Sequence, residues 1–309
     1  MNTPAQDSAG TLESAARQLE AHADYRVLRR LDPARQYPPL PAGAPRARAC
    51  VLDTETTGTD PAADQMIELG IVVFDYDRET GQVGPVLGVY DGLEDPGRPI
   101  PPESTAIHGI TDEMVAGKRL DEAEIATVMG GVGLVIAHNA SFDRRFVEAR
   151  LPTFANLPWA CSFREVPWRD AGGGSAALEF LAYRAGFFYE GHRAEIDCRA
   201  LLEVLSRPLG QGSDTALKVL LASARQPTHR LWATGSPFES KDLLRTRGYR
   251  WNAPLRCWSV DLTPERVEAE LAWLKSAVYG GRSMALDLDV LDARARYSER
   301  TGRRERVRT

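Results

Sequence analysis

The spacing of apolar positions changes several times along the chain, and each change predicts a different element. Apolar side chains recur about every third or fourth position over residues 12–31, which predicts a helix. Residues 32–48 contain five prolines, a content typical of a linker or of an arm that lies on a surface. The apolar runs at 49–52 and 66–76 each predict a strand buried in a sheet.

The region after these two strands alternates between strand and helix patterns. The polar stretch 77–82 contains Gly81 and therefore predicts a hairpin turn before a third strand at 83–90. The elements predicted beyond it are strands at 134–137 and 159–163, and helices at 112–116, 121–130, 141–149, 175–185 and 194–205. A hairpin followed by strands that alternate with helices predicts an α/β fold, with a mixed five-stranded sheet covered by helices.

Changes in composition divide the chain into six predicted parts. They are an N-terminal helical segment 1–31, whose first ten residues are expected to be disordered, a Pro-rich linker 32–47, a main domain 48–207, a linker 208–227, a small α+β module 228–280 and an Arg-rich tail 281–309. Within the module, Thr263 and Pro264 suit the first positions of a helix at 264–277. Residues 292–309 contain seven arginines and three acidic residues, which predicts a mobile, solvated extension.

The net charge of −5 conceals an uneven distribution. Residues 49–207 carry 26 acidic and 13 basic side chains, whereas the flanks carry 17 acidic and 25 basic ones. A protein that only binds nucleic acid is expected to be basic throughout. An acidic middle with basic flanks instead suits a domain that holds divalent cations beside segments that bind a polyanion.

The four cysteines predict reduced, buried thiols in a cytoplasmic protein. The closest two are 37 residues apart and no CxxC is present, so the sequence favours neither a zinc site nor a disulfide framework.

No apolar run approaches the roughly 18 residues of a membrane span, and the N-terminus lacks the features of a secretory signal. We therefore expect no association with a membrane.

The first candidate site segment is the run DTETTG at 53–58, directly after the strand predicted at 49–52. Asp53 and Glu55 are two positions apart, so an extended backbone places both side chains on the same face. Neighbouring carboxylates repel each other, and folding is expected to avoid such a pair unless a cation lies between them. The segment therefore predicts one part of a metal site.

Two further segments place acidic residues where helices begin. In HNASFD, Asp143 lies just after the strand at 134–137. In HRAEID, His192 and Asp197 lie at the first turns of a predicted helix, close enough in sequence to address one ligand. Functional groups of α/β sheets commonly lie at such strand ends and helix starts.

Together, these segments resemble the DnaQ-like 3′→5′ exonucleases of the DEDDh type, a family that includes polymerase proofreading (epsilon) subunits and several ribonucleases. The resemblance covers about residues 48–207, and it includes the HxAxxD form at 192–197 and the stretch IHGIT at 107–111. Position 193 is Arg, which excludes the sister type with tyrosine four positions before the last acid. The implied fold is RNase H-like, in agreement with the predicted strand order.

The resemblance implies hydrolysis of phosphodiester bonds with two divalent ions. It assigns Asp53, Glu55, Asp143 and Asp197 to two Mg²⁺ or Mn²⁺ ions per active site, because these ions prefer hard oxygen ligands. It assigns to His192 the removal of a proton from the attacking water.

The resemblance also implies contacts to the substrate. Thr56, Thr57 and Gly58 are expected to grip the 3′-terminal nucleotide. Three weaker candidates for substrate contact are His108, Asn139 and Phe142. For His108, a purely structural role in its loop is an equal alternative.

The small module interleaves cations with aromatic rings, the combination that a single-strand binding surface needs. The candidate auxiliary nucleic-acid contacts are Arg245, Arg247, Arg250, Trp251 and Arg256. The rings are also what the core of a module of about 50 residues requires, with the cations on its solvated face. Both interpretations stay open at this point.

The sequence therefore predicts a cytoplasmic, metal-dependent 3′→5′ exonuclease that removes nucleoside 5′-monophosphates from single-stranded 3′ ends, with DNA favoured over RNA. One alternative is an exoribonuclease with the same chemistry. Another is a non-catalytic nucleic-acid-binding scaffold on a nuclease fold, which would have no need of four clustered acids and a histidine. Replication or repair proteins are expected partners, although the chain contains no convincing short motif for a sliding clamp.

Overall fold

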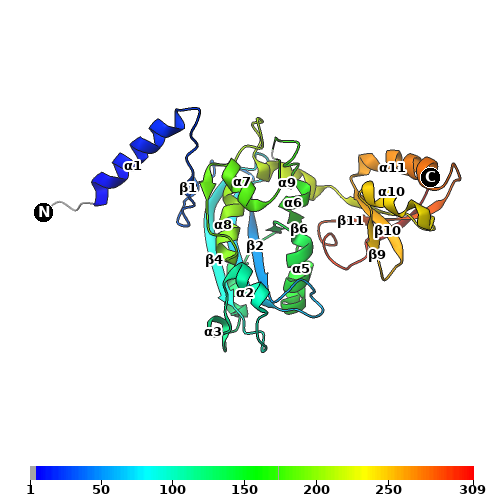
Figure 1. Ribbon diagram of the computed structural model, residues 1–309, viewed down its shortest axis with the longest axis horizontal. Coiled ribbons are helices and arrows are strands. Elements are labelled where there is room, and N and C mark those ends of the chain that lie inside the picture. Colours follow the sequence, from blue (N-terminus) through cyan, green and yellow to red (C-terminus); the bar gives the residue numbers. More distant parts are fainter. Residues whose placement is uncertain (1–4, 173) are drawn as a thin grey trace.

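The computed structural model describes residues 5–172 and 174–309, and its centre is a mixed sheet of five strands (Figure 1). The strands lie in the order β4-β3-β2-β5-β6. The pairs β2–β3 and β3–β4 are antiparallel, whereas β5 is parallel to both β2 and β6. The bounds are β2 Arg46–Thr56, β3 Met66–Asp77, β4 Val83–Leu93, β5 Leu134–Ala137 and β6 Trp159–Cys161. This arrangement confirms the predicted RNase H-like sheet.

Helices cover both faces of this sheet. Successive residues of the central strand β2 point to opposite faces, so this strand contributes side chains to two cores. Val51 of β2 packs in a core with α7 (Leu178–Arg184), α8 (Ala194–Leu205) and α9 (Ala216–Arg225). Leu52, the next residue, packs in a second core with α4 (Glu122–Val128) and α5 (Ala140–Arg150). The predicted helices at 121–130, 141–149, 175–185 and 194–205 are thus confirmed with small shifts of their ends.

Several short elements connect these layers. They are α2 (Pro102–His108), α3 (Asp112–Val115), the 3₁₀ turn η1 (Pro152–Asn156), α6 (Ser162–Glu165) and β7 (Phe187–Phe188). Across the described residues, every helix is too short or too polar to cross a bilayer.

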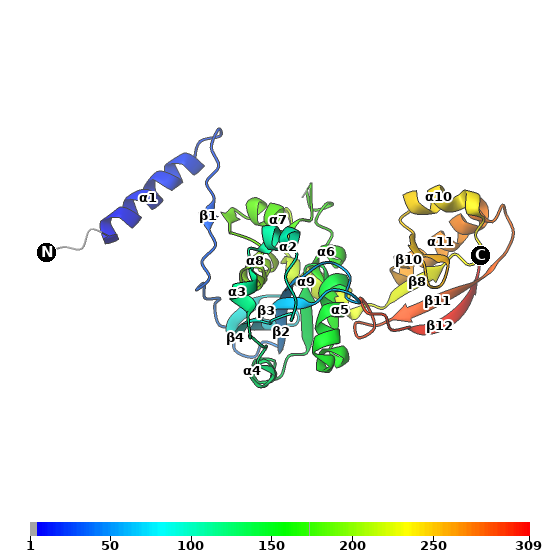
Figure 2. The same cartoon turned by 60° about the horizontal axis from the view of Figure 1, so that its bottom comes forward.

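The N-terminal helix differs from the prediction over residues 12–31. Helix α1 spans Ala5–Glu20 and stands away from the body of the protein in both views, while residues 1–4 lie outside the described range (Figures 1 and 2). The chain then turns, and β1 (Arg29–Arg30) pairs in parallel with β7. The helix prediction was wrong for the residues after Glu20. Leu31 is buried in the core of the main sheet, and its N–H donates to the carbonyl of Phe188, so tertiary contacts override the helical pattern.

The predicted linker 208–227 instead contains α9, which belongs to the main domain. Leu217, Leu220 and Leu221 of this helix are buried at 3% exposure or less. Thr215 caps the helix, since its side-chain oxygen accepts a hydrogen bond from the Lys218 N–H at 3.1 Å. The repeat of apolar residues at positions 217, 220, 221 and 224 was a helical signal that the division by composition overlooked.

The C-terminal region forms a second five-stranded sheet, in the order β12-β11-β8-β10-β9 and antiparallel throughout. Its strands are β8 (Thr228–Trp232), β9 (Arg250–Asn252), β10 (Cys257–Leu262), β11 (Ala285–Leu291) and β12 (Arg303–Arg308). Its helical elements are η2 (Phe238–Ser240), α10 (Lys241–Thr246), η3 (Pro264–Arg266), α11 (Val267–Trp273) and the π-helical turn η4 (Leu274–Val278). The predicted helix at 264–277 is the continuous run from η3 to η4.

The predicted solvated Arg-rich extension is therefore wrong, because β11 and β12 complete this sheet. Leu286 and Leu288 of β11 enter its core, and the intervening acids face arginines of β12. Arg304 donates two hydrogen bonds to Asp289 at 2.7 and 2.9 Å, and Arg306 pairs with Asp287 at 3.0 Å. Opposite charges on paired strands thus account for the arginines.

The connection between β11 and β12 returns to the main domain and locks the two sheets together. Arg144 of α5, whose side chain is fully buried, donates hydrogen bonds to the carbonyls of Arg294 and Arg296 at 2.6 Å each. Glu165 of α6 accepts hydrogen bonds from Arg296 at 3.0 Å and from the Tyr297 hydroxyl at 2.9 Å. Buried hydrogen bonds of this kind fix the orientation of the C-terminal module.

Candidate active site

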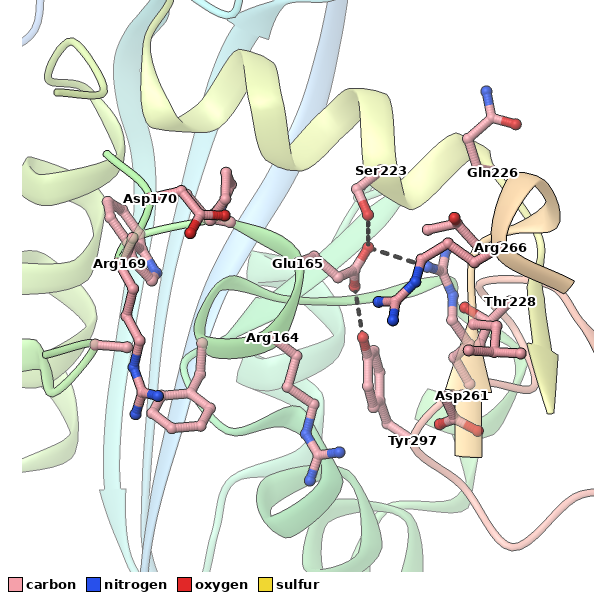
Figure 3. A pocket seen from close by; sticks show the side chains of 18 of the residues that line it. Arg164, Glu165, Arg169, Asp170, Ser223, Gln226, Thr228, Asp261, Arg266 and Tyr297 are labelled. Atoms are coloured by element: carbon pink, nitrogen blue, oxygen red, sulfur yellow. Dashed lines mark hydrogen bonds and ion pairs between the residues drawn. The ribbon is translucent and has the colours of Figure 1, made fainter. Parts of the chain in front are cut away.

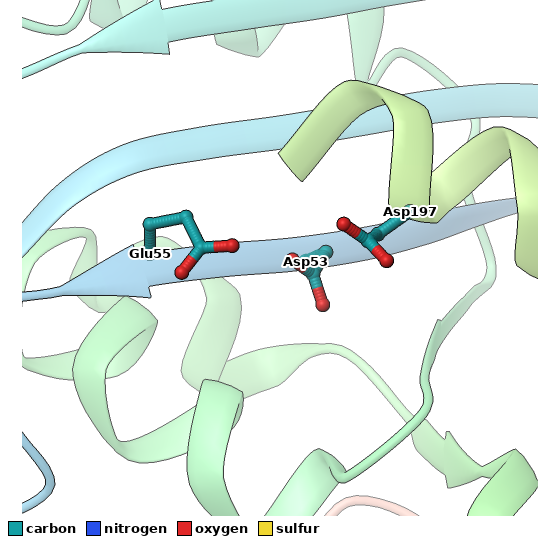
Figure 4. A group of neighbouring side chains, drawn as sticks. All are labelled: Asp53, Glu55 and Asp197. Atoms are coloured by element: carbon teal, nitrogen blue, oxygen red, sulfur yellow. The ribbon is translucent and has the colours of Figure 1, made fainter. Parts of the chain in front are cut away.

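Three acidic side chains meet above β2, on the face that α8 covers. Asp53 and Glu55 share the orientation of Val51 because they follow it at intervals of two residues. Helix α8 crosses this face and brings Asp197 close to both (Figure 4). The three side chains offer carboxylate oxygens that all lie within 4.8 Å of one another. The structure therefore brings together three of the four acids named from the sequence.

Asp143 reaches the same region from the opposite face of the sheet. It lies in the first turn of α5, is 3% exposed, and accepts a hydrogen bond from the Thr54 hydroxyl at 3.0 Å. Thr54 stands between Asp53 and Glu55 on the strand and so points toward α5. Asp143 is not one of the three acids in the 4.8 Å group, but its charge acts on Asp53. The fourth acid is thus adjacent to the cluster.

Burial raises the pKa of every carboxyl group in the cluster, and repulsion from neighbouring acids adds to it at Asp53 and Glu55. Burial, followed by the charges of Asp143 and Asp197, raises the pKa of Asp53 well above its usual value. Burial and the charge of Asp197 raise the pKa of Glu55 to about 8. Burial raises the pKa of Asp143 to about 7 and also raises that of Asp197. Ionised carboxylates at this density are stable only beside positive charge.

The donor set fits a hard divalent cation. All four side chains offer carboxylate oxygens, the ligands that Mg²⁺ and Mn²⁺ prefer over nitrogen or sulfur. The nearest thiol on this face, Cys198, is fully buried, and its Sγ donates to the carbonyl of Gly70 at 3.4 Å. The chemistry of the site is therefore that of an oxygen-ligated cation site.

His192 lies at the rim of the cluster, in the loop between β7 and α8. Its side chain is 52% exposed, and its Nε2 lies 3.8 Å from the carboxylate of Glu179. Its φ of +65° places it in the left-handed region, which is uncommon for a residue with a side chain. The charge of His192 lowers the pKa of Asp197, so the imidazole lies near that carboxylate. A strained, exposed histidine beside the acids is suited to proton transfer.

Two side chains that the sequence analysis missed position Asp197 and the start of α8. The Tyr189 hydroxyl donates to Asp197 Oδ1 at 3.1 Å, and the Arg193 N–H donates to Oδ2 at 3.1 Å. Glu68 of β3, which is fully buried, accepts hydrogen bonds from Arg193 Nε and from the Ala194 N–H, both at 2.9 Å. A lone acid within the apolar run MIELGIVVF was the signal for Glu68.

Gly70 permits the close approach of α8 to β3. A Cβ at this position would lie 2.4 Å from the carbonyl carbon of Ala194, well inside van der Waals contact. Any side chain at this position would therefore displace the helix that carries Asp197.

Replacing Glu68 with glutamine is expected to lower the free energy of unfolding by about 2 kcal/mol, because Arg193 loses its buried charged partner. We also expect kcat to fall, since the loop that carries His192 loses its anchor. Urea denaturation together with a nuclease assay measures both effects. The matched control is Glu190→Gln, which removes an exposed ion pair with Arg30. It is expected to lower the free energy of unfolding by less than about 0.5 kcal/mol. Equal effects of the two substitutions would contradict the positioning role.

The residues predicted to bind the terminal nucleotide make contacts within their own loop. The Thr57 hydroxyl accepts hydrogen bonds from the Gln65 N–H and from Arg98, both at 3.0 Å, so it is engaged in holding its own loop. The Thr56 hydroxyl donates to the Gly58 carbonyl at 2.6 Å. A Cβ at Gly58 would lie 2.4 Å from the carboxylate of Asp64. These contacts build a compact loop beside Glu55.

The three weaker substrate candidates have different surroundings. His108 is 5% exposed, and its Nδ1 accepts a hydrogen bond from the Ile110 N–H at 3.0 Å. Its Nε2 has no partner in the part of the chain that the structure describes. Asn139 immediately precedes α5, and Phe142 packs against Phe146 at 5.0 Å between ring centroids. His108 thus combines a structural contact with one free ring nitrogen.

The auxiliary candidates of the C-terminal module are distributed over different surfaces. Arg245 of α10 pairs with Asp242 at 3.2 Å, and Arg247 pairs with the buried Glu270 at 3.0 Å. Arg256 is exposed in the turn between β9 and β10. Arg250 and Trp251 lie on β9 and line a groove that faces the main domain. The five residues therefore do not form one surface.

Comparisons with known proteins identify a family and several similar chains. The sequence profile of an exonuclease family, RNase_T, matches residues 50–205. The PolC-type DNA polymerase III of Thermotoga maritima is 33% identical over 168 residues, which are 51% of this chain and 11% of the relative. The DNA polymerase III subunit epsilon of Treponema pallidum is 32% identical over 165 residues, 50% of this chain and 73% of the relative. This chain thus spans only about a tenth of the PolC-type relative.

A solved structure described as Exonuclease X in complex with 5′ overhanging duplex DNA is also similar. It is 26% identical, with a TM-score of 0.41, over 57% of this chain and 99% of that one.

The chain belongs to the RNase_T exonuclease family, since the profile match covers half of its length. The predicted DnaQ-like family and the predicted enzyme class, an exonuclease, are thereby confirmed.

Proposed function

We propose that the protein is a divalent-metal-dependent 3′→5′ exonuclease that releases nucleoside 5′-monophosphates from single-stranded 3′ ends, with DNA as the favoured substrate. The observation that carries the proposal is the convergence of Asp53, Glu55 and Asp197 within 4.8 Å at the end of a strand, beside Asp143 and an exposed histidine. The relatives are parts of DNA polymerases, which supports the preference for DNA and suggests replication or repair proteins as partners.

Each residue of the cluster has a role in this proposal. Asp53, Glu55, Asp143 and Asp197 hold two Mg²⁺ or Mn²⁺ ions. When bound, such ions activate water and neutralise the negative charge that develops on the scissile phosphate. His192 accepts a proton from the attacking water through its ring nitrogen, and its exposed position gives the proton a path to solvent.

The remaining residues orient this machinery. Tyr189 and Glu68 hold Asp197 and the His192 loop in place, as their hydrogen bonds indicate. The loop at 56–58, with His108 and Asn139, borders the space where the terminal nucleotide would lie. The proposal retains the predicted cytoplasmic setting, which the free cysteines support.

A degradation assay on matched 5′-labelled single-stranded DNA and RNA oligomers tests the proposal. We expect a ladder that shortens from the 3′ end in Mg²⁺ or Mn²⁺, that is lost in EDTA, and that is faster on DNA. Faster shortening of RNA would favour the exoribonuclease alternative. Binding without cleavage of either oligomer would favour the non-catalytic scaffold.

A further inference from the structure

The boundary between the two sheets contains two adjoining hollows that share Arg164, Asp261 and Tyr297. One is a cavity of about 660 Å³, where Glu165 links Ser223 to Tyr297 and Arg296 (Figure 3). The other, of about 460 Å³, lies between α5, α6 and β9. We call this second hollow the interdomain groove; it is lined by Arg145, Arg164, Arg230, Arg250 and Trp251, among others.

The groove brings together cations that the fold does not neutralise. The side chain of Arg250 has no hydrogen-bond or ion-pair partner in the described part of the chain. Arg164 donates only to the Ser141 hydroxyl, at 3.3 Å, within that same part. Arg164 and Arg250 line the same groove, and the positive charge of Arg164, followed by burial, lowers the pKa of Arg250. Neighbouring cations that have no ion-pair partner are suited to binding an anion.

The acid on the same wall is already engaged. Asp261 accepts two hydrogen bonds from Arg230, at 2.7 and 3.0 Å. Its charge is therefore largely matched within the module, and it leaves the charges of Arg164 and Arg250 available to a ligand.

The wall of the groove is the helix-free face of the C-terminal sheet. Arg250 pairs with Ser259, and Ser259 pairs with Trp232, so these three side chains share one face. Leu231 points to the other face, where Leu244 of α10 and Leu274 pack against it. The face that carries Arg250 is therefore open toward the main domain rather than covered by helices of its own module.

The opposite wall leads directly to the candidate active site. Ser141 and Arg145 line the groove and belong to the first turns of α5, the helix that carries Asp143. The contacts of Arg144 and Glu165 with residues 294–297 hold the two walls in a fixed relation, so the groove is preformed. Trp251 follows Arg250 on β9, so its ring lies on the opposite face of the sheet, 5.6 Å between ring centroids from Trp258.

We propose that the interdomain groove binds the single strand of nucleic acid upstream of the 3′ end that the active site cleaves, with Arg164 and Arg250 contacting its phosphates. The inference rests on the proposed function for the direction of the strand, and it assigns to the C-terminal module the role of extending the binding site by several nucleotides. A groove lined by four arginines, one of them on the helix that carries Asp143, matches the phosphate backbone of the strand that the proposed active site cleaves.

The test measures binding without cleavage, in the full-length chain carrying Asp53→Asn. We expect Arg250→Glu to raise the Kd for a 20-nucleotide single-stranded DNA at least tenfold, and Arg164→Glu to do the same. The slope of log Kd against log salt concentration is expected to fall by about 0.7 for each phosphate that the protein no longer binds. For a five-nucleotide oligomer, which reaches only the acidic cluster, the expected change is less than twofold.

The matched control is Arg303→Glu, the same change of charge on the same module. Arg303 is 75% exposed on β12 and pairs with Glu305 at 2.8 Å, on the side of the sheet away from the groove. The Kd of the Arg303→Glu variant for the 20-nucleotide oligomer is expected to stay within twofold of that of the parent chain carrying Asp53→Asn. The proposal is overturned if Arg250→Glu and Arg303→Glu weaken binding equally, or if Arg250→Glu leaves binding unchanged. Because no cleavage is measured, loss of the proposed activity and loss of the groove are separate outcomes.

Discussion

Replacing Asp53 with asparagine is expected to abolish exonuclease turnover and, at the same time, to stabilise the metal-free protein. Asp53 is one of four carboxyl groups whose pKa values burial raises, and the charges of Asp143 and Asp197 raise the pKa of Asp53 further. Asparagine keeps the shape of the side chain but removes one negative charge from this cluster. The remaining acids then repel one another less, so the free energy of unfolding in EDTA is expected to rise by about 1 kcal/mol, which is roughly 3 °C in melting temperature.

Activity is expected to change in the opposite direction. Ligands of the divalent ions contribute several kcal/mol to stabilisation of the transition state, so kcat is expected to fall by at least about 10³-fold. Mg²⁺ or Mn²⁺ is expected to raise the melting temperature of the wild-type protein but not that of the variant.

Thermal melts in EDTA and in Mn²⁺, combined with a nuclease assay, test both effects. Asp170→Asn, a change of the same kind at an exposed acid, is the control and is expected to alter neither quantity. If the Asp53→Asn variant has a lower melting temperature in EDTA than the wild type, the carboxylates of the cluster do not destabilise the metal-free protein by repelling one another. Retained turnover would contradict the assignment of Asp53.

Replacing His192 with glycine is expected to remove most of the activity without loss of stability. The residue adopts a φ of +65°, which glycine accommodates without a steric penalty, and its side chain is half exposed. The free energy of unfolding is therefore expected to change by less than about 1 kcal/mol. Loss of a general base is expected to lower kcat by about 10²–10⁴-fold, with little change in KM.

His22→Gly is the matched control, since His22 is an exposed histidine far from the acids in sequence. It is expected to leave kcat unchanged. If His192→Gly retains kcat within tenfold of the wild type, another group must take the proton from water, and the role proposed for His192 is wrong.

The main sheet and the acidic cluster could be predicted because their signals are local. The alternation of side chains along a strand places Asp53 and Glu55 on one face whatever else the chain does, and the long apolar runs identify the strands around them. Helix α8 begins and ends at the predicted residues because a regular apolar face and acids in its first turn lie within twelve consecutive positions. The tail and the N-terminal segment were predicted less well, because pairing with distant strands decides their structure.

Local sequence determined the family, the order of the strands in the main domain and the identity of the four acids. Each of these depends on residues a few positions apart, where the period of the backbone converts spacing into orientation. Only the tertiary structure decided that Glu68 anchors Arg193 across 125 positions and that Arg144 holds residues 294–296. It likewise decided that Arg164 of α6 and Arg250 of β9 line one groove, because side chains of different domains meet only once the buried contacts between the domains have formed.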